Sequence, residues 1–286
     1  MKTRLIGSLA ALSLWLFNSA ALASPVAMVT DLAGAITLGE AGKSRPAALL
    51  AYLEPATTLR IPAGARMVIT FFSKPVEVTL TGPAEATLAA EGVQVTKGAA
   101  PTVRSLADTH ADAARRFEPI QRERVALATV QMRSILLLQL TIDGPSNTNV
   151  YSATPLLSWK GPGGVESYRV VVNDSQGNTL VDQTVSGTSL ALDSPLRYGA
   201  SYGWRVEAKS RSGEPLSAKA TFAVVDGAQA KRIASMKPSG GAPFSERLLF
   251  AAQLQSEGLA YEAKREWQTL AAERPEDPSL RAWAAR

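Results

Sequence analysis

The strongest constraint on the fold is an alternating run of residues near the middle of the chain. In segment 202–209 the apolar residues Tyr202, Trp204, Val206 and Ala208 alternate with glycine and charged residues. This period of two is typical of a strand with one face buried and the other exposed. The segment therefore predicts a half-buried β-strand.

Further short strands surround this segment, and turn residues such as Asp, Ser, Gly and Pro end most of them. The predicted strands cover residues 156–159, 167–173, 179–185, 189–192 and 217–224, and the apolar run 135–140 leads into them. Short strands at this spacing favour a two-sheet antiparallel sandwich over residues 135–226.

Four residues of this region carry a family resemblance: Trp159, Leu196, Gly199 and Tyr202. The segment resembles a fibronectin type III-like domain, in which Trp159 matches the core tryptophan and the other three match the tyrosine corner. The resemblance implies an immunoglobulin-like sandwich. It implies no particular chemistry, because such domains are scaffolds.

The N-terminus has the features of a secretory signal peptide, residues 1–23. Lys2 and Arg4 precede the apolar run Leu5–Phe17, and Ala21-Leu22-Ala23 supplies small residues for cleavage before Ser24. The alternative is an uncleaved anchor, but the run is short for a membrane span. We therefore expect an exported protein that does not span the membrane after cleavage.

The cysteine content and the net charge limit where the protein can be located and what it can bind. The chain has no cysteine, which excludes disulfides, thiolate metal sites and lipidation at a lipobox cysteine. Signal cleavage removes two of the 30 basic residues and none of the 25 acidic ones, so the net charge falls from +5 to +3. A charge this small and scattered gives no indication of nucleic-acid binding. The composition is that of a soluble periplasmic protein.

Residues 24–104 form a second β-rich region with glycine-punctuated strands. Its motifs are Gly34-Ala35, Leu59-x-Ile61-Pro62-x-Gly64 and Leu80-x-Gly82-Pro83-Ala84. On these motifs the region resembles the FecR-type periplasmic domain, which implies a β-roll or sandwich. FecR-type regulators of sigma factors carry a cytoplasmic segment and a membrane helix before this domain. A cleavable signal stands there instead, so the sequence predicts no direct sigma-factor regulation.

A helical connector is predicted over residues 105–134. Ala111, Ala113 and Ala114 favour a helix, and Pro119 is expected to break or kink it after Glu118. The arginines of this segment are expected to form a solvated face; they are Arg115, Arg116, Arg122 and Arg124.

The C-terminal part is predicted to be a short helix capped by Asp226 and a linker (227–243), followed by an α-hairpin (244–286) with Ser245 as its N-cap. The hairpin resembles a tetratricopeptide repeat at Ala251, Leu254, Gly258, Ala263, Trp267, Leu270 and Pro275. One repeat cannot cover its own apolar face. The face predicted to bind a protein partner or a second copy consists of Phe250, Leu254, Leu280 and Trp283.

The sequence offers little chemistry. Its only histidine, His110, is interpreted as a solvated helix residue, and no nucleophile elbow, phosphate loop or zinc motif occurs. The carboxylates considered for catalysis all sit in predicted strands or turns; they are Asp143, Asp174, Asp182 and Asp193. The segment Asn173–Asn178 is interpreted as a turn rather than a calcium loop. We therefore expect no enzyme, no cofactor and no metal.

The overall expectation is a mainly β, non-enzymatic periplasmic interaction or scaffold protein. The alternative is an envelope glycan- or exopolysaccharide-binding protein that uses an exposed aromatic groove. The aromatic residues available for such a groove are interpreted as core instead, because they alternate with polar residues; they are Trp159, Tyr168, Tyr202 and Trp204.

Overall fold

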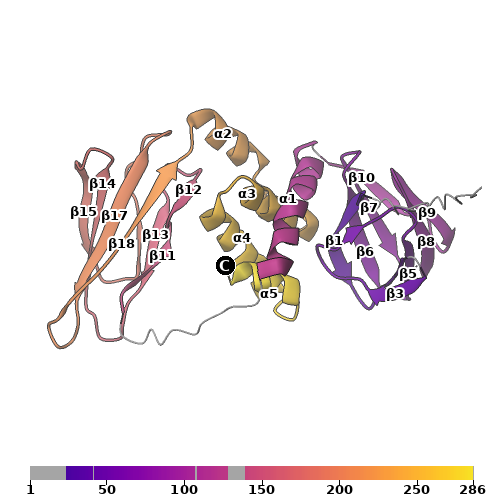
Figure 1. Cartoon of the computed structure of the whole chain (residues 1–286), viewed down its shortest axis with the longest axis horizontal. Coiled ribbons are helices and arrows are strands. Elements are labelled where there is room, and N and C mark those ends of the chain that lie inside the picture. The colour runs from indigo at the N-terminus through magenta and orange to yellow at the C-terminus, as the bar shows by residue number, and fades with distance from the viewer. Residues whose placement is uncertain (1–23, 41, 107, 128–138, 286) are drawn as a thin grey trace, which may run out of the picture.

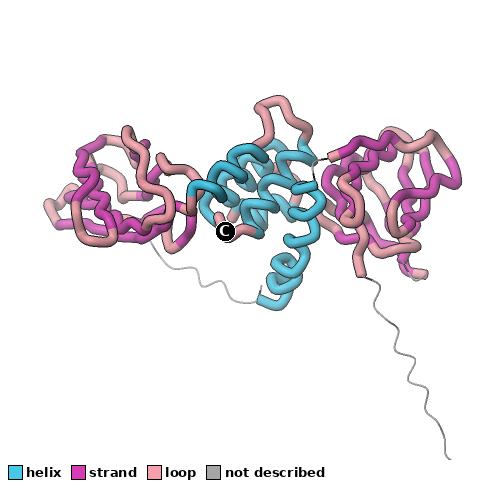
Figure 2. The backbone as a smooth tube through the Cα atoms, turned by 90° about the horizontal axis from the view of Figure 1, so that it is seen from above, coloured by secondary structure: helices cyan, strands magenta, loops and turns pink. Residues whose placement is uncertain are grey.

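The protein consists of two β modules with a helical unit between them (Figures 1 and 2). The computed structural model describes residues 24–40, 42–106, 108–127 and 139–285, and these residues form eighteen strands and five helices. The mainly β architecture with helices toward the C-terminus confirms the predicted fold class. No helix within the described ranges combines the length and the apolar character needed to cross a bilayer. The predicted signal peptide, residues 1–23, lies outside the described residues.

The N-terminal module packs two five-stranded antiparallel sheets around one core. The first has the order β10-β7-β6-β1-β4, with strands Thr102–Ser105, Val76–Thr81, Arg66–Phe71, Ala27–Ala33 and Tyr52–Leu53. The second has the order β3-β2-β5-β8-β9, with strands Lys43–Pro46, Thr37–Glu40, Thr58–Ile61, Ala84–Ala89 and Gly92–Lys97. Every second residue of β8 is buried, because alternate side chains point into this core.

The second module is a sandwich of a three-stranded and a five-stranded sheet. The smaller sheet has the order β11-β13-β16, with strands Thr141–Gly144, Leu156–Lys160 and Ser189–Ala191. The larger has the order β12-β18-β17-β14-β15, with strands Thr148–Val150, Pro215–Val224, Ser201–Lys209, Tyr168–Asp174 and Thr179–Val185. The predicted run 135–140 falls mostly outside the described residues. Strands β11 and β12 were not predicted, because both are very short and hold turn-forming residues.

The four aromatic residues that were interpreted as core do lie in the core of the sandwich. Trp159, Tyr168, Tyr202 and Trp204 are each at most 4% exposed. The Tyr202 hydroxyl accepts from the Arg197 amide at 2.8 Å and donates to the Arg197 carbonyl at 3.1 Å, which is the hydrogen bonding of a tyrosine corner. The aromatic groove of the glycan-binding alternative therefore cannot be built from these rings.

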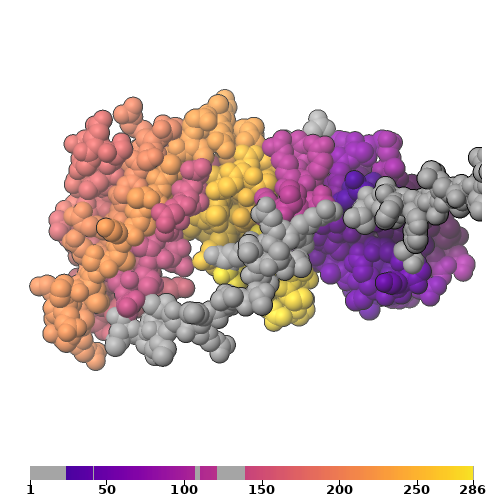
Figure 3. All heavy atoms as spheres, in the orientation of Figure 1, coloured from indigo at the N-terminus to yellow at the C-terminus, as the bar shows by residue number. Residues whose placement is uncertain are grey.

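Five helices form the unit between the β modules, which we call the hub. They are α1 (Asp108–Leu127), α2 (Gly227–Met236), α3 (Phe244–Ser256), α4 (Ala260–Glu273) and α5 (Pro278–Ala284). The hub is discontinuous in sequence, because α1 precedes the sandwich and α2–α5 follow it. Helix α1 packs against α3, which packs antiparallel to α4. Figure 3 shows hub atoms filling the space between the modules.

The predictions about helix ends have different outcomes: the Ser245 cap is wrong and the Asp226 cap is confirmed. Helix α1 continues through Pro119, so of the predicted break or kink the break does not occur. Buried Phe117 before the proline and partly buried Ile120 after it both pack in the hub core, and this burial offsets the lost backbone hydrogen bond. Ser245 is buried and caps nothing, because α3 begins after Pro243. Asp226 does cap α2, accepting from the Ala228 and Gln229 amides at 2.9 Å each.

Candidate functional site

The four residues predicted to bind a partner lie inside the hub. Phe250, Leu254, Leu280 and Trp283 are each at most 3% exposed and belong to one apolar cluster. The prediction of an uncovered hairpin face is therefore wrong. The face is covered from within the chain, because Phe117 of α1, Leu50 of the N-terminal module and Ile233 of α2 belong to the same buried cluster.

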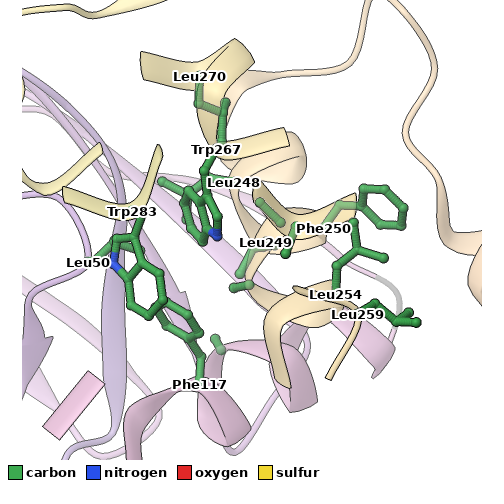
Figure 4. Close-up of a cluster of buried hydrophobic side chains, with 14 of the residues drawn as sticks. Leu50, Phe117, Leu248, Leu249, Phe250, Leu254, Leu259, Trp267, Leu270 and Trp283 are labelled. Carbon is green, nitrogen blue, oxygen red and sulfur yellow. The ribbon is translucent and has the colours of Figure 1, made fainter. Parts of the chain in front are cut away.

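Aromatic rings show how α1 covers the hairpin. The Phe117 ring centroid lies 4.6 Å from that of Trp283 and 5.8 Å from that of Trp267, and the two tryptophans stack at 5.4 Å. Figure 4 shows Phe117 and Trp283 side by side, with Leu50 of the N-terminal module next to Trp283. Residues from three distant parts of the sequence thus complete one core.

A buried carboxylate joins the hub to the N-terminal module. Asp31 of β1 is 4% exposed, and its Oδ1 accepts from the Arg274 guanidinium at 2.6 Å. Its other oxygen pairs with Arg66 of the neighbouring strand. Arg274 also covers the Phe244 ring, with its guanidinium carbon 3.6 Å from the centroid. Separation of the two units would leave this buried carboxylate with Arg66 alone, so the pair with Arg274 favours one relative position of the hub and the N-terminal module.

A second ionic cluster at the same junction surrounds the only histidine. Arg104 donates to Glu77 at 2.9 Å and pairs with Glu246 of α3. His110 lies beside this cluster, and both of its ring nitrogens are buried without a hydrogen-bond partner among the described residues. Burial lowers the pKa of His110. Its interpretation as a solvated residue is therefore wrong, although Arg115 and Arg116 of α1 are exposed as predicted.

Helix α4 joins the hub to the sandwich. The Tyr261 hydroxyl donates to the Leu156 carbonyl at 2.6 Å, and its ring covers Gly144 so closely that a Cβ there would lie 2.3 Å from a ring carbon. Glu262 Oε1 accepts from the Tyr151 amide at 2.9 Å, while its buried Oε2 has no hydrogen-bond partner in the described part of the chain. Burial raises the pKa of Glu262 to about 7. The residue borders a cavity of about 460 Å³, shared with Arg265.

The outer face of the larger sandwich sheet carries three hollows, which together we call the outer trough. The hollow at the tip, of about 900 Å³, is lined by Arg169, Glu207, Lys209 and Arg211 among others. The middle hollow measures about 440 Å³ and the one nearest the hub about 340 Å³. The last two share Asn147 and Thr221, so they adjoin.

The middle hollow lies over the central strand β17. Gly203 and the buried Val171 line it, together with Arg205, Lys219, Asn147, Asn173 and Thr221. None of these residues was predicted to be functional. The sequence feature that could have indicated this hollow is Gly203, the only residue without a side chain in the alternating run 202–209.

The carboxylates considered for catalysis have separate partners. Asp182 pairs with Arg169 at 2.6 Å, and Asp143 lies 3.6 Å from Lys160 and 3.7 Å from Lys264. Asp174 accepts from the Gln176 and Asn178 amides at 2.9 Å each, so the Asn173–Asn178 segment forms the end of β14 and the turn to β15. Asp193 accepts from Gln183 at 3.4 Å. Among the described residues, no group of three or more His, Asp or Glu side chains is arranged to hold a metal ion.

Comparison with known proteins adds little. No family model and no curated protein matches the chain. CopC from Methylosinus trichosporium OB3b matches with 25% identity over 31% of this chain and 96% of its own, at a TM-score of 0.26. The twitchin kinase region from C. elegans matches with 22% identity over 32% of this chain and 17% of its own length, at a TM-score of 0.23. A tetra-tandem repeat from the extending region of a large adhesion protein matches with 16% identity. The match covers 71% of this chain and 42% of that chain, at a TM-score of 0.24. Likenesses this weak support no functional argument.

Proposed function

We propose that the protein is a non-enzymatic binding and scaffold protein of the bacterial envelope. In this proposal the hub is a brace that holds the two β modules at a set distance, and the outer trough receives the ligand. One observation supports this most: the apolar faces of the helices are used inside the chain, whereas three hollows lie on one outward face of the sandwich. A concave surface with convergent polar groups is where ligands usually bind.

The envelope location belongs to the proposal and rests on the sequence. Lys2, Arg4 and the apolar run Leu5–Phe17 have the pattern of an export signal, and a chain without cysteine needs no oxidising step to fold. The resemblances to FecR-type and fibronectin type III-like domains remain predictions that agree with this location.

The absence of cysteine also allows a direct test in the full-length mature protein. A photo-crosslinker attached to Ser217→Cys would sit on the trough, whereas one on Ser235→Cys would sit on the exposed side of α2. We expect adducts with envelope components from the first variant and few from the second. Adducts from position 235 alone, or from neither position, would contradict binding through the trough.

A further inference from the structure

The middle hollow of the trough holds a glycine that the fold does not require. Gly203 occupies the centre of β17, which pairs with β14 on one side and β18 on the other. A Cβ added there would meet nothing within 4 Å, and the residue is not among those with positive φ. At Gly144, by contrast, Tyr261 leaves no room for a side chain. A strand interior disfavours glycine, so a free glycine there indicates close approach by another molecule.

Two cations face one another across the same hollow. Arg205 and Lys219 are directly opposite on β17 and β18, and Arg205 is also opposite Val171 on β14. Like charges in this arrangement destabilise a sheet. Arg205 is partly neutralised by Glu207, whose Oε1 accepts from its Nε at 2.8 Å, but Lys219 makes no ion pair among the described residues. A bound anion would relieve this repulsion.

The remaining lining residues define the chemistry of that anion. Of the residues that line the middle hollow, two are cations and none is an acid. Asn147, Asn173 and Thr221 offer amide and hydroxyl groups, which pair well with ligand hydroxyls. The only aromatic residue of the lining is Trp204, which is 3% exposed, so stacking on a ring contributes little.

We propose that the middle hollow binds a segment of an acidic polysaccharide, with a carboxylate between Arg205 and Lys219 and sugar hydroxyls on Asn147, Asn173 and Thr221. The adjoining hollow toward the hub, which contains no charged residue in its lining, accommodates the next part of the chain. This inference rests on the proposed function of the trough and adds the class of ligand.

The test uses a variant that closes the hollow without removing charge. Gly203→Val fits the open space and suits a strand, so it should keep or raise the thermal midpoint. Binding of an oligouronate to the full mature protein, measured by calorimetry at low salt, should weaken at least about tenfold. Lys219→Ala should also weaken it, whereas Lys231→Ala, a matched exposed lysine on α2, should not. A neutral glucan of the same length should bind poorly to all of them.

Three outcomes would overturn the inference. Equal oligouronate affinity in Gly203→Val and the wild type would indicate diffuse attraction to positive charge rather than a site. Oligoglutamate that binds as tightly as oligouronate, and with the same response to the variants, would indicate an acidic peptide. If oligouronate does not bind but the adducts from position 217 persist, the proposed function stands and the ligand class is wrong.

Discussion

Glu262 allows the sharpest test of how the sandwich is attached to the hub. Its carboxyl is buried where α4 meets the sandwich, and burial raises its pKa from 4.5 to about 7. A carboxyl with a raised pKa binds its proton more tightly in the folded state than in the unfolded state. The stability that it contributes is therefore fully present below pH 4.5 and is lost as the pH rises to 7.

The magnitude follows from the two pKa values. The difference between about 7 and 4.5 corresponds to about 3 kcal/mol, at about 1.4 kcal/mol for each pH unit. In Glu262→Gln the amide oxygen can still accept from the Tyr151 amide, but the group no longer ionises. We therefore expect the variant to match the wild type near pH 4 and to exceed it by about 3 kcal/mol near pH 8.

Urea unfolding followed by tryptophan fluorescence at pH 4, 6 and 8 would measure this difference. Glu266→Gln is the matched control, because Glu266 lies one turn away on α4 and borders the same cavity. We expect the control to show no comparable change with pH. If Glu262→Gln changes stability equally at pH 4 and pH 8, the assignment of a buried, protonated Glu262 is incorrect.

Three further predictions concern the hub. Trp283→Ala removes the ring that stacks on Trp267 and contacts Phe117, and should cost about 3–5 kcal/mol in chemical denaturation. Arg274→Met leaves Asp31 with one cation and should lower stability by about 1–3 kcal/mol, with looser coupling of the N-terminal module in small-angle scattering. The pKa of His110 is lower in the folded than in the unfolded protein, so as the pH falls from 7 to 5 the unfolded state binds the proton first and the wild type loses stability. His110→Gln should reduce this loss, because glutamine does not titrate. Unfolding curves at both pH values would show whether the two proteins diverge.

Local patterns predicted most of the elements. The alternation from Tyr202 to Ala208 marked a strand and its buried face, and Asp226 marked the start of a helix. These features depend on neighbours in the sequence, where period and capping chemistry act directly. The strands β11 and β12 were too short for any such pattern.

Long-range packing was the part that the sequence could not show. Phe117 lies in the predicted helical connector and Trp283 in the predicted uncovered hairpin face, and nothing local indicates that the two rings meet. The burial of His110 has the same cause, since Arg104 and Glu246 reach it from other elements. The outer trough was missed because its lining comes from five different strands and depends on their register.

The discontinuous hub has a consequence for the order in which the chain can fold. Phe117 and Trp283 are 166 positions apart, from 117 to 283, so their contact closes a very long loop. Each β module can form from its own contiguous residues, but α1 has no helical partner until α3–α5 have been synthesised and delivered. Until then the apolar side of α1, like Met28, Leu49 and Leu50 of the N-terminal module, lacks part of its cover. Pulsed hydrogen exchange during refolding should then show protection arriving last in α1 and α3.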